Sequence, residues 1–166
     1  MIKNKNVNIL IISFLLIAVM AVMLIFFLNK VKEDFSENIT VSADGVTEET
    51  LSVRDLKLVP AESKEYSVNL VCEASGNFCI YLNCEEKEDG GMKPFVEVTV
   101  KANGEAVYEG TLAELIDSGK TVEFEGELKS TEPLVVTIVY EMPREIGNEA
   151  QGTYSDFDIH LKIEKS

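Results

Sequence analysis

The sequence predicts an all-β domain, an antiparallel β-sandwich with one short helix, preceded by a single N-terminal transmembrane helix. Two observations predict the sandwich: short runs of alternating apolar and polar residues recur along the chain, and turn residues separate them at intervals of about ten residues. A third observation, an uncharged apolar run near the N-terminus, predicts the helix. The chain has 166 residues, and those that follow the run suffice for one domain with one core.

The apolar run covers residues 7–28, and Asn8 and Ser13 are its only polar side chains. A helix of this length, at roughly 1.5 Å per residue, is about 33 Å long and matches the ~30 Å hydrocarbon layer of a bilayer. A soluble helix of the same length would show a polar face. The sequence therefore predicts the lipid bilayer as a partner, through residues 7–28.

The flanking charges predict the orientation of this helix. Lys3 and Lys5 precede the apolar run, whereas Lys30 and Lys32 after it are followed at once by Glu33. The positive-inside rule then favours a cytoplasmic N-terminus, with the C-terminal part of the chain outside the cell.

Four segments follow from this orientation: residues 1–6 in the cytoplasm, the anchor at 7–28, a stalk at 29–38 and an extracellular domain at 39–166. The apolar run is longer than that of a cleaved signal peptide, and no small-residue cleavage pattern follows it closely. We therefore expect an uncleaved signal anchor in the cell membrane, and a secreted form only if the anchor is cut.

The chain is strongly acidic from residue 33 onward. All 29 acidic residues but only 11 of the 15 basic ones lie at or after position 33, a formal charge of −18. Nucleic acids and anionic lipids bind surfaces of the opposite sign, so the charge argues against both as partners of the domain.

The first strands are expected around residues 39–41 and 51–58, the second of which stops at Pro60. Residues 66–72 and 78–84 then alternate in the same way around a turn at 74–77, which predicts a hairpin.

This hairpin bears on the three cysteines, Cys72, Cys79 and Cys84. If Cys72 lies opposite Cys79, the two can form a disulfide. If the apolar faces match instead, Cys72 lies opposite Ile80 and remains a buried thiol, and hydrophobic matching favours this register. The cysteine spacing fits no zinc template, and the single histidine, His160, is distant in sequence, so no metal site is predicted.

Residues 85–91 are expected to form an acidic loop, without the spacing of a calcium-binding loop. Val96, Val98 and Val100 then mark the buried face of a strand. Asn103-Gly104 is a two-residue turn signal that returns the chain into a hairpin.

A short helix is expected next. Thr111 and Glu114 have the spacing of a capping box, Leu112 and Leu115 fall on one helical face, and Gly119 can end the helix.

Strands are expected at 122–128 and at 134–140, the second nearly continuously apolar and therefore central in its sheet. The connection 142–153 leads to the last strand, in which Phe157 to Ile163 alternate with polar residues. By this alternation His160 faces solvent.

Two stretches resemble the TasA/camelysin family of Gram-positive biofilm-matrix and cell-surface proteins. Residues 107–115 are similar to a family step from hairpin to helix, and residues 142–153 to a family loop with the pattern G-N-x-x-Q-G. The loop residues that match are Gly147, Asn148, Gln151 and Gly152. We interpret them as structural: glycines for positive φ, and amide side chains that hold the loop backbone.

The resemblance implies a jelly-roll-like sandwich outside the cell, in a family whose members form fibres by donating an N-terminal strand to the next subunit. Camelysin has been placed among the metallopeptidases, but one histidine cannot supply an H-E-x-x-H zinc site.

The sequence predicts no enzyme, no catalytic residue and no cofactor, since neither a G-x-S-x-G elbow nor a histidine base can be named. The first hypothesis is a membrane-anchored extracellular β-sandwich with a structural or assembly role, by edge-strand pairing between subunits or with other surface proteins. The alternative is a binding module for a divalent ion, a glycan or a protein, through the acidic or the C-terminal loop.

Overall fold

The computed structural model describes residue 20, residues 35–43 and residues 45–166. The chain divides into two units, and the second, Asp34–Ser166, contains the folded domain. The predicted segments 1–6 and 7–28 lie outside the described residues, apart from Met20. In the part that is described, no helix has the length and apolarity needed to cross a bilayer.

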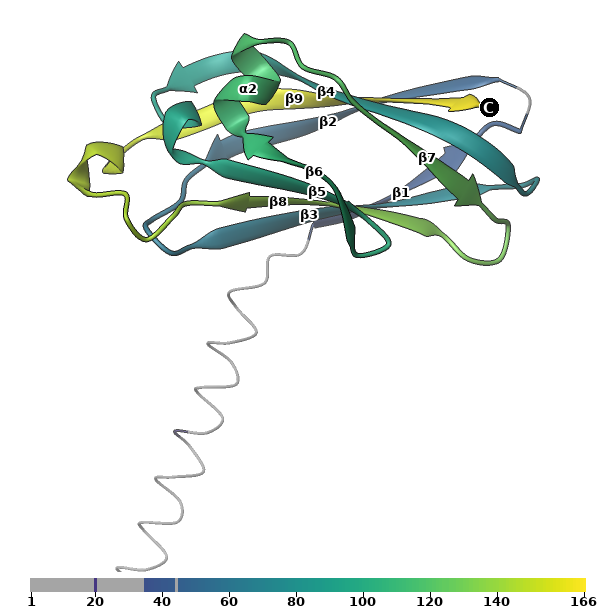
Figure 1. Ribbon diagram of the computed structural model, residues 1–166, viewed down its shortest axis with the longest axis horizontal. Helices are drawn as coiled ribbons and strands as arrows, with labels where there is room; N and C mark the ends of the chain where they lie inside the picture. Colours follow the sequence, from purple (N-terminus) through teal and green to yellow (C-terminus); the bar gives the residue numbers. More distant parts are fainter. Residues whose placement is uncertain (1–19, 21–34, 44) are drawn as a thin grey trace, which may run out of the picture. The chain divides into compact units, whose positions relative to one another are not determined.

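Two β-sheets face each other in the domain (Figure 1), which confirms the all-β sandwich. Sheet A has the order β1 (Phe35–Val41), β3 (Ser63–Cys72), β8 (Leu134–Glu141), β5 (Glu97–Ala102), β6 (Glu105–Thr111). Sheet B has the order β2 (Val46–Leu56), β9 (Tyr154–Lys165), β4 (Gly76–Gly90), β7 (Val122–Leu128). The helical elements are η1 (Lys93–Phe95), α2 (Leu112–Asp117) and η2 (Asn148–Ala150).

Strands β2 to β9 form nested antiparallel pairs: β2 with β9, β3 with β8, β4 with β7 and β5 with β6. This is the eight-strand arrangement of a jelly roll. Strand β1 is added outside it, at the edge of sheet A, and its pairing with β3 is parallel. The expectation of an antiparallel sandwich therefore holds for eight strands and is wrong for the first. Strand β1 also begins at Phe35, inside the segment predicted to be a stalk.

The core lies between the sheets and is built by alternation. In β9 the side chains of Phe157, Ile159, Leu161 and Ile163 are buried, as the sequence predicts. Strand β8 lies between β3 and β5, which confirms that it is central. The described core residues run from Ile39 to Ile163, so the segment 34–166 carries its own core.

The local turn signals are confirmed. Asn103 and Gly104 have φ values of 48° and 87° and join β5 to β6. Helix α2 begins with a complete capping box, in which the Thr111 side chain accepts from the Glu114 N–H and the Glu114 side chain accepts from the Thr111 N–H. Gly119 follows the helix with φ at 59°.

The predicted hairpin between residues 66–72 and 78–84 is wrong. The first segment belongs to β3 in sheet A and the second to β4 in sheet B. Residues 73–75 carry the chain from one sheet to the other, so the two strands lie on opposite sides of the core. Both hairpin registers considered for the cysteines are therefore absent.

The predicted acidic loop is also wrong in part, because residues 85–90 continue β4. Glu85 pairs with Asp158 of β9 and Gly90 pairs with Tyr154, with a register shift between Glu86 and Glu88. Pairing with β9 supplies the backbone hydrogen bonds, and local cations reduce the repulsion between the carboxylates. A run of charged residues can therefore form a strand when a neighbouring strand, here β9, pairs with its backbone.

Candidate functional site

The three cysteines are unpaired in the structure. Cys72 and Cys84 are buried in the core from opposite sheets, and burial raises the pKa of the Cys84 thiol to about 12. Cys79 alternates with the buried Phe78 and Ile80 and so lies on the outer face of sheet B, half-buried. The disulfide considered between Cys72 and Cys79 therefore lacks its geometry, because Cys72 is buried in the core from sheet A and Cys79 lies on the outer face of sheet B.

Backbone hydrogen bonds hold the loop 142–153, which contains the residues that match the family pattern. Gly152 has φ at 78°, as expected, whereas Gly147 has φ at −88° and needs no glycine. The Gln151 N–H donates to the Asn148 carbonyl, and the Thr153 N–H and hydroxyl both donate to the Ala150 carbonyl. Asn148 and Gln151 are exposed, and within the described residues neither amide side chain makes a hydrogen bond. The loop backbone is therefore held by its own hydrogen bonds, and the expected role of the amide side chains stays a prediction.

A buried lysine occupies the place where the acidic segment would hold a cation. The Nζ atom of Lys93 lies 2.7 Å from a carboxylate oxygen of Glu86, 2.7 Å from one of Asp117 and 3.4 Å from one of Asp89. Burial would lower the pKa of Lys93, but its hydrogen bonds to Asp117, Glu86 and Asp89 outweigh burial and the pKa is raised. No cluster suited to a metal ion occurs among the residues that the structure places.

A polar network crosses the outer face of sheet B around His160. The Nδ1 atom of His160 lies 3.0 Å from the Thr50 hydroxyl, and its Nε2 atom lies 3.1 Å from the Glu85 carboxylate. Strands β2, β9 and β4 thus present a hydroxyl, an imidazole and a carboxylate in one row. The sequence places His160 on the solvent side but does not indicate these partners, since they come from strands distant in sequence.

The network continues through ion pairs. The Lys87 ammonium lies 3.0 Å from Glu85 and 3.4 Å from Asp158, and Arg54 lies 2.7 Å from Asp158. The Ser52 hydroxyl also donates to Asp158. The hydrogen bonds from Ser52 and then from Arg54 lower the pKa of Asp158, and those from Lys87 and then from His160 lower the pKa of Glu85.

A shallow hollow of about 530 Å³ adjoins His160, and its lining includes Glu48, Thr50, Asn83 and Lys162. It offers no aromatic platform, and Lys162 is already paired with Glu164 at 2.5 Å. The donors and acceptors around His160 satisfy one another, as groups that brace three strands do. This arrangement favours a structural role for the network over ligand binding or hydroxyl activation.

The four strands at the sheet edges differ in how they are protected against pairing with another chain. Charges and bulges are the usual protection. Strand β7 carries Glu123, Glu125 and Glu127. Strand β2 carries four charged residues and a register shift next to Asp55, where φ is 52°, and β6 carries Glu105, Glu109 and a register shift in its pairing.

Strand β1 has the least protection. Glu37 is its single charged residue, and its seven residues pair with Tyr66–Cys72 without a shift. Its buried side chains are Ile39 and Val41, and the Asn69 amide donates to Asn38 on the outer face at 2.9 Å. The jelly roll is complete without β1, so this strand is the element whose place can be taken by the same strand of another copy.

Comparisons with solved structures return distant β-rich proteins. The chain is similar to PliG of Aeromonas hydrophila, a periplasmic inhibitor of g-type lysozyme, at 11% identity and TM-score 0.34, over 78% of this chain and 99% of that one. It is similar to the pre-peptidase C-terminal domain of Bacillus anthracis collagenase, at 11% identity and TM-score 0.33, over 80% and 98%. It is also similar to the C-terminal CBM6 of the laminarinase LamC from Zobellia galactanivorans, at 12% identity and TM-score 0.34, over 73% and 100%.

No family model and no curated protein matches the chain. The structural likenesses are too distant to carry a functional argument. The resemblance to the TasA/camelysin family stays a prediction.

Proposed function

We propose that the protein is a non-enzymatic, membrane-anchored extracellular module whose copies assemble at the cell surface or in the surrounding matrix by exchanging β1. In the monomer, β1 covers the edge of its own β3. In the assembly, β1 of one copy covers β3 of the next.

One observation carries the proposal: β1 lies outside the nested pairs of the jelly roll and is joined to it by the short segment 42–45. Exchange forms the same contacts between copies that β1 makes within one copy. The monomer and the exchanged assembly therefore differ in free energy mainly by the conformation of the hinge at 42–45 and by the entropy lost on association.

The head-to-tail nature of the exchange supports an extended assembly. A contact in which one surface of a copy meets a different surface of the next is heterologous, and it produces rings or open filaments. Only residues 29–34 separate the predicted anchor from β1. Copies held in one membrane would therefore present their exchangeable strands close to that membrane.

A disulfide between β1 and β3 tests the exchange. Asn38 and Asn69 are direct neighbours in the parallel ladder, at the spacing that a disulfide requires. The variant Asn38→Cys/Asn69→Cys is prepared in residues 34–166 with Cys79→Ser, and oxidised at low protein concentration so that β1 is fixed to its own domain. We expect the oxidised chain to stay monomeric in sedimentation velocity, and the reduced chain to assemble as its concentration rises.

The matched control is Ser67→Cys/Thr137→Cys. These residues face each other on β3 and β8, which exchange does not separate. This variant should assemble equally well oxidised and reduced. Assembly of the β1-locked chain while it is oxidised would contradict the proposal, and so would a reduced chain that stays monomeric at every concentration.

A further inference from the structure

Strand β7 lies at one edge of sheet B, and its outer edge pairs with no strand among the residues that the structure places. Its seven residues pair with β4 without a register shift. In Figure 1 it crosses the near side of the domain, and no other strand is drawn in front of it. A regular edge strand presents a row of unpaired backbone N–H and C=O groups, so it can accept a strand from another chain.

The two faces of β7 differ in their chemistry. Its outward side chains are the exposed Glu123, Glu125 and Glu127. Apart from Gly126, its inward residues are apolar and buried: Val122, Phe124 and Leu128. A strand added beside β7 would share this alternation, because cross-strand neighbours lie on the same face. Its outer positions would therefore lie beside carboxylates, and its inner positions beside the edge of the core.

The domain itself neutralises few of these carboxylates. In the part of the chain that the structure describes, neither Glu123 nor Glu125 forms an ion pair. Glu127 lies 3.4 Å from Lys129, and both side chains are exposed. The ladder partners on β4 carry no positive charge: Tyr81, Cys79 and Asn77. On β9, the next strand, Lys162 is already paired with a carboxylate of its own strand at 2.5 Å. A cation on an added strand would thus meet carboxylates that lack a partner.

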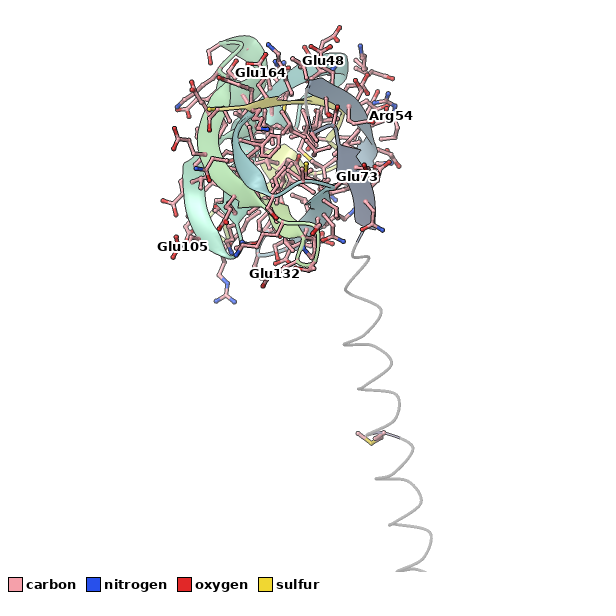
Figure 2. All side chains as sticks on the ribbon, turned by 90° about the vertical axis from the view of Figure 1, so that its right-hand side faces the viewer. Glu48, Arg54, Glu73, Glu105, Glu132 and Glu164 are labelled. Atoms are coloured by element: carbon pink, nitrogen blue, oxygen red, sulfur yellow. The ribbon has the colours of Figure 1, made fainter. Side chains whose placement is uncertain are left out.

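The same glutamates disfavour a second copy of the chain at this edge. The formal charge from residue 33 onward is −18. Acidic side chains such as Glu48, Glu105 and Glu164 also project from other parts of the surface (Figure 2). Two β7 edges brought together would place glutamates opposite glutamates, which is destabilising. A regular edge that repels strands of its own kind selects a partner of opposite charge.

We infer that β7 is a docking edge for an extended segment of another protein in which lysine or arginine alternates with apolar residues. The segment adds to the four strands of sheet B, with its cations beside the glutamates and its apolar residues beside the core. This contact is independent of β1 exchange, because β7 and β1 belong to different sheets.

The test uses the peptide Lys-Val-Lys-Thr-Lys-Val-Lys, which matches the length of β7. One control peptide has the same composition with its lysines adjacent. The other has the alternating sequence with every peptide nitrogen methylated, which removes the backbone donors. Each labelled peptide is titrated with the oxidised Asn38→Cys/Asn69→Cys, Cys79→Ser chain of residues 34–166, in which β1 cannot exchange. Fluorescence anisotropy measures the dissociation constant.

We expect the alternating peptide to bind, and both control peptides to bind at least about tenfold more weakly although they carry the same number of lysines. Added salt should weaken the binding, because salt screens the attraction between lysines and glutamates. Hydrogen exchange of the complex should slow at backbone amides of β7, which the added strand covers.

Charge reversal on two edge strands supplies matched variants. Glu123→Lys/Glu125→Lys should raise the dissociation constant of the alternating peptide at least about tenfold. Glu105→Lys/Glu109→Lys changes the net charge equally on β6, the edge strand of sheet A whose pairing has a register shift. At about 0.15 M salt the screening length is about 8 Å, so this remote change should alter the constant by less than about threefold. Thermal unfolding checks that each variant is folded.

Equal weakening by both reversals would overturn the assignment of β7. Equally tight binding of the methylated peptide would overturn it too, because charge attraction alone would then explain the binding. So would an alternating peptide that does not bind at about 1 mM, or self-association of the locked chain that this peptide reverses, since the edge would then belong to a second copy. Because β1 is locked in every variant, these outcomes leave the strand-exchange result unaffected.

Discussion

Replacing Lys93 by methionine tests the account of the acidic segment. Methionine keeps most of the apolar stem of the side chain and removes the ammonium. The side chain of Lys93 is 9% exposed, whereas those of Glu86, Asp89 and Asp117 are 31%, 48% and 58% exposed. The substitution therefore removes a buried cation from three carboxylates that water can partly reach.

The exposures set the size of the effect. Breaking a fully buried ion pair costs about 3–5 kcal/mol, and an exposed pair contributes about 0–1 kcal/mol. Since these carboxylates can partly rehydrate, we expect Lys93→Met to reduce the free energy of unfolding by about 2 kcal/mol at neutral pH. The loss should arise where η1, α2 and the end of β4 meet, since Lys93 links these three elements.

The pH dependence gives this prediction a second readout. The backbone N–H of Gly91 and then Lys93 lower the folded-state pKa of Asp89. A lowered folded-state pKa stabilises the native state above the unfolded value and loses this stabilisation as pH falls through the folded value. The difference between Lys93→Met and the parent should therefore be full at neutral pH and shrink below about pH 4.

Urea unfolding of residues 34–166, followed by circular dichroism at several pH values, measures both effects. Lys57→Met is the control, because Lys57 pairs with Asp55 while its side chain is 57% exposed. The control should change the free energy by less than about 0.5 kcal/mol. A Lys93→Met chain as stable as this control would refute the role given to the buried ammonium.

Two further predictions concern the helix cap and the cysteines. Thr111→Ala removes one half of the capping box and should reduce the free energy of unfolding in urea by about 1 kcal/mol. Thr111→Ser should keep most of this stability. An alanine variant as stable as the parent would contradict the role of the cap. In the native protein a thiol reagent should modify Cys79 first, because Cys72 and Cys84 are buried and the pKa of Cys84 is raised to about 12. Equal reaction rates at all three thiols would be inconsistent with this fold.

Local signals in the sequence predict local structure well. The Asn103-Gly104 turn, the Thr111–Glu114 capping box and the alternation in the last strand each depend on a few adjacent residues, and each is confirmed. Alternation also places His160 on the outer face, because the direction of a side chain along a strand depends on its neighbours in sequence.

Which strands pair with each other is harder to predict from the sequence. The alternating segments before Cys72 and after Phe78 look like a hairpin because a short turn joins them, but the jelly roll places them in opposite sheets. The sequence predicts a loop at the acidic segment for two reasons. Its ladder partner β9 is distant in sequence, and no local pattern indicates that the nearby Lys93 is buried. The parallel pairing of β1 follows from the edge left open by β3, which no local pattern reveals.

The surface of the domain also depends on which strands are neighbours. The sequence shows an excess of acidic residues but not how they are distributed over the two sheets, because that distribution depends on the strand order. The four sheet edges likewise become comparable only when the strand order is known. The edge position of β1, which supports assembly, therefore belongs to the topology of sheet A.

The most direct measurement of strand exchange uses two populations of the chain. One carries Asn38→Cys and the other Asn69→Cys, both with Cys79→Ser, and one population is made heavier by isotope labelling. After mixing at high concentration and oxidation, the account predicts a disulfide between β1 of one population and β3 of the other, identified by mass spectrometry of the cross-linked peptides. If that cross-link is absent while a doubly substituted chain readily forms the same disulfide within itself, β1 does not leave its own domain and the account is contradicted.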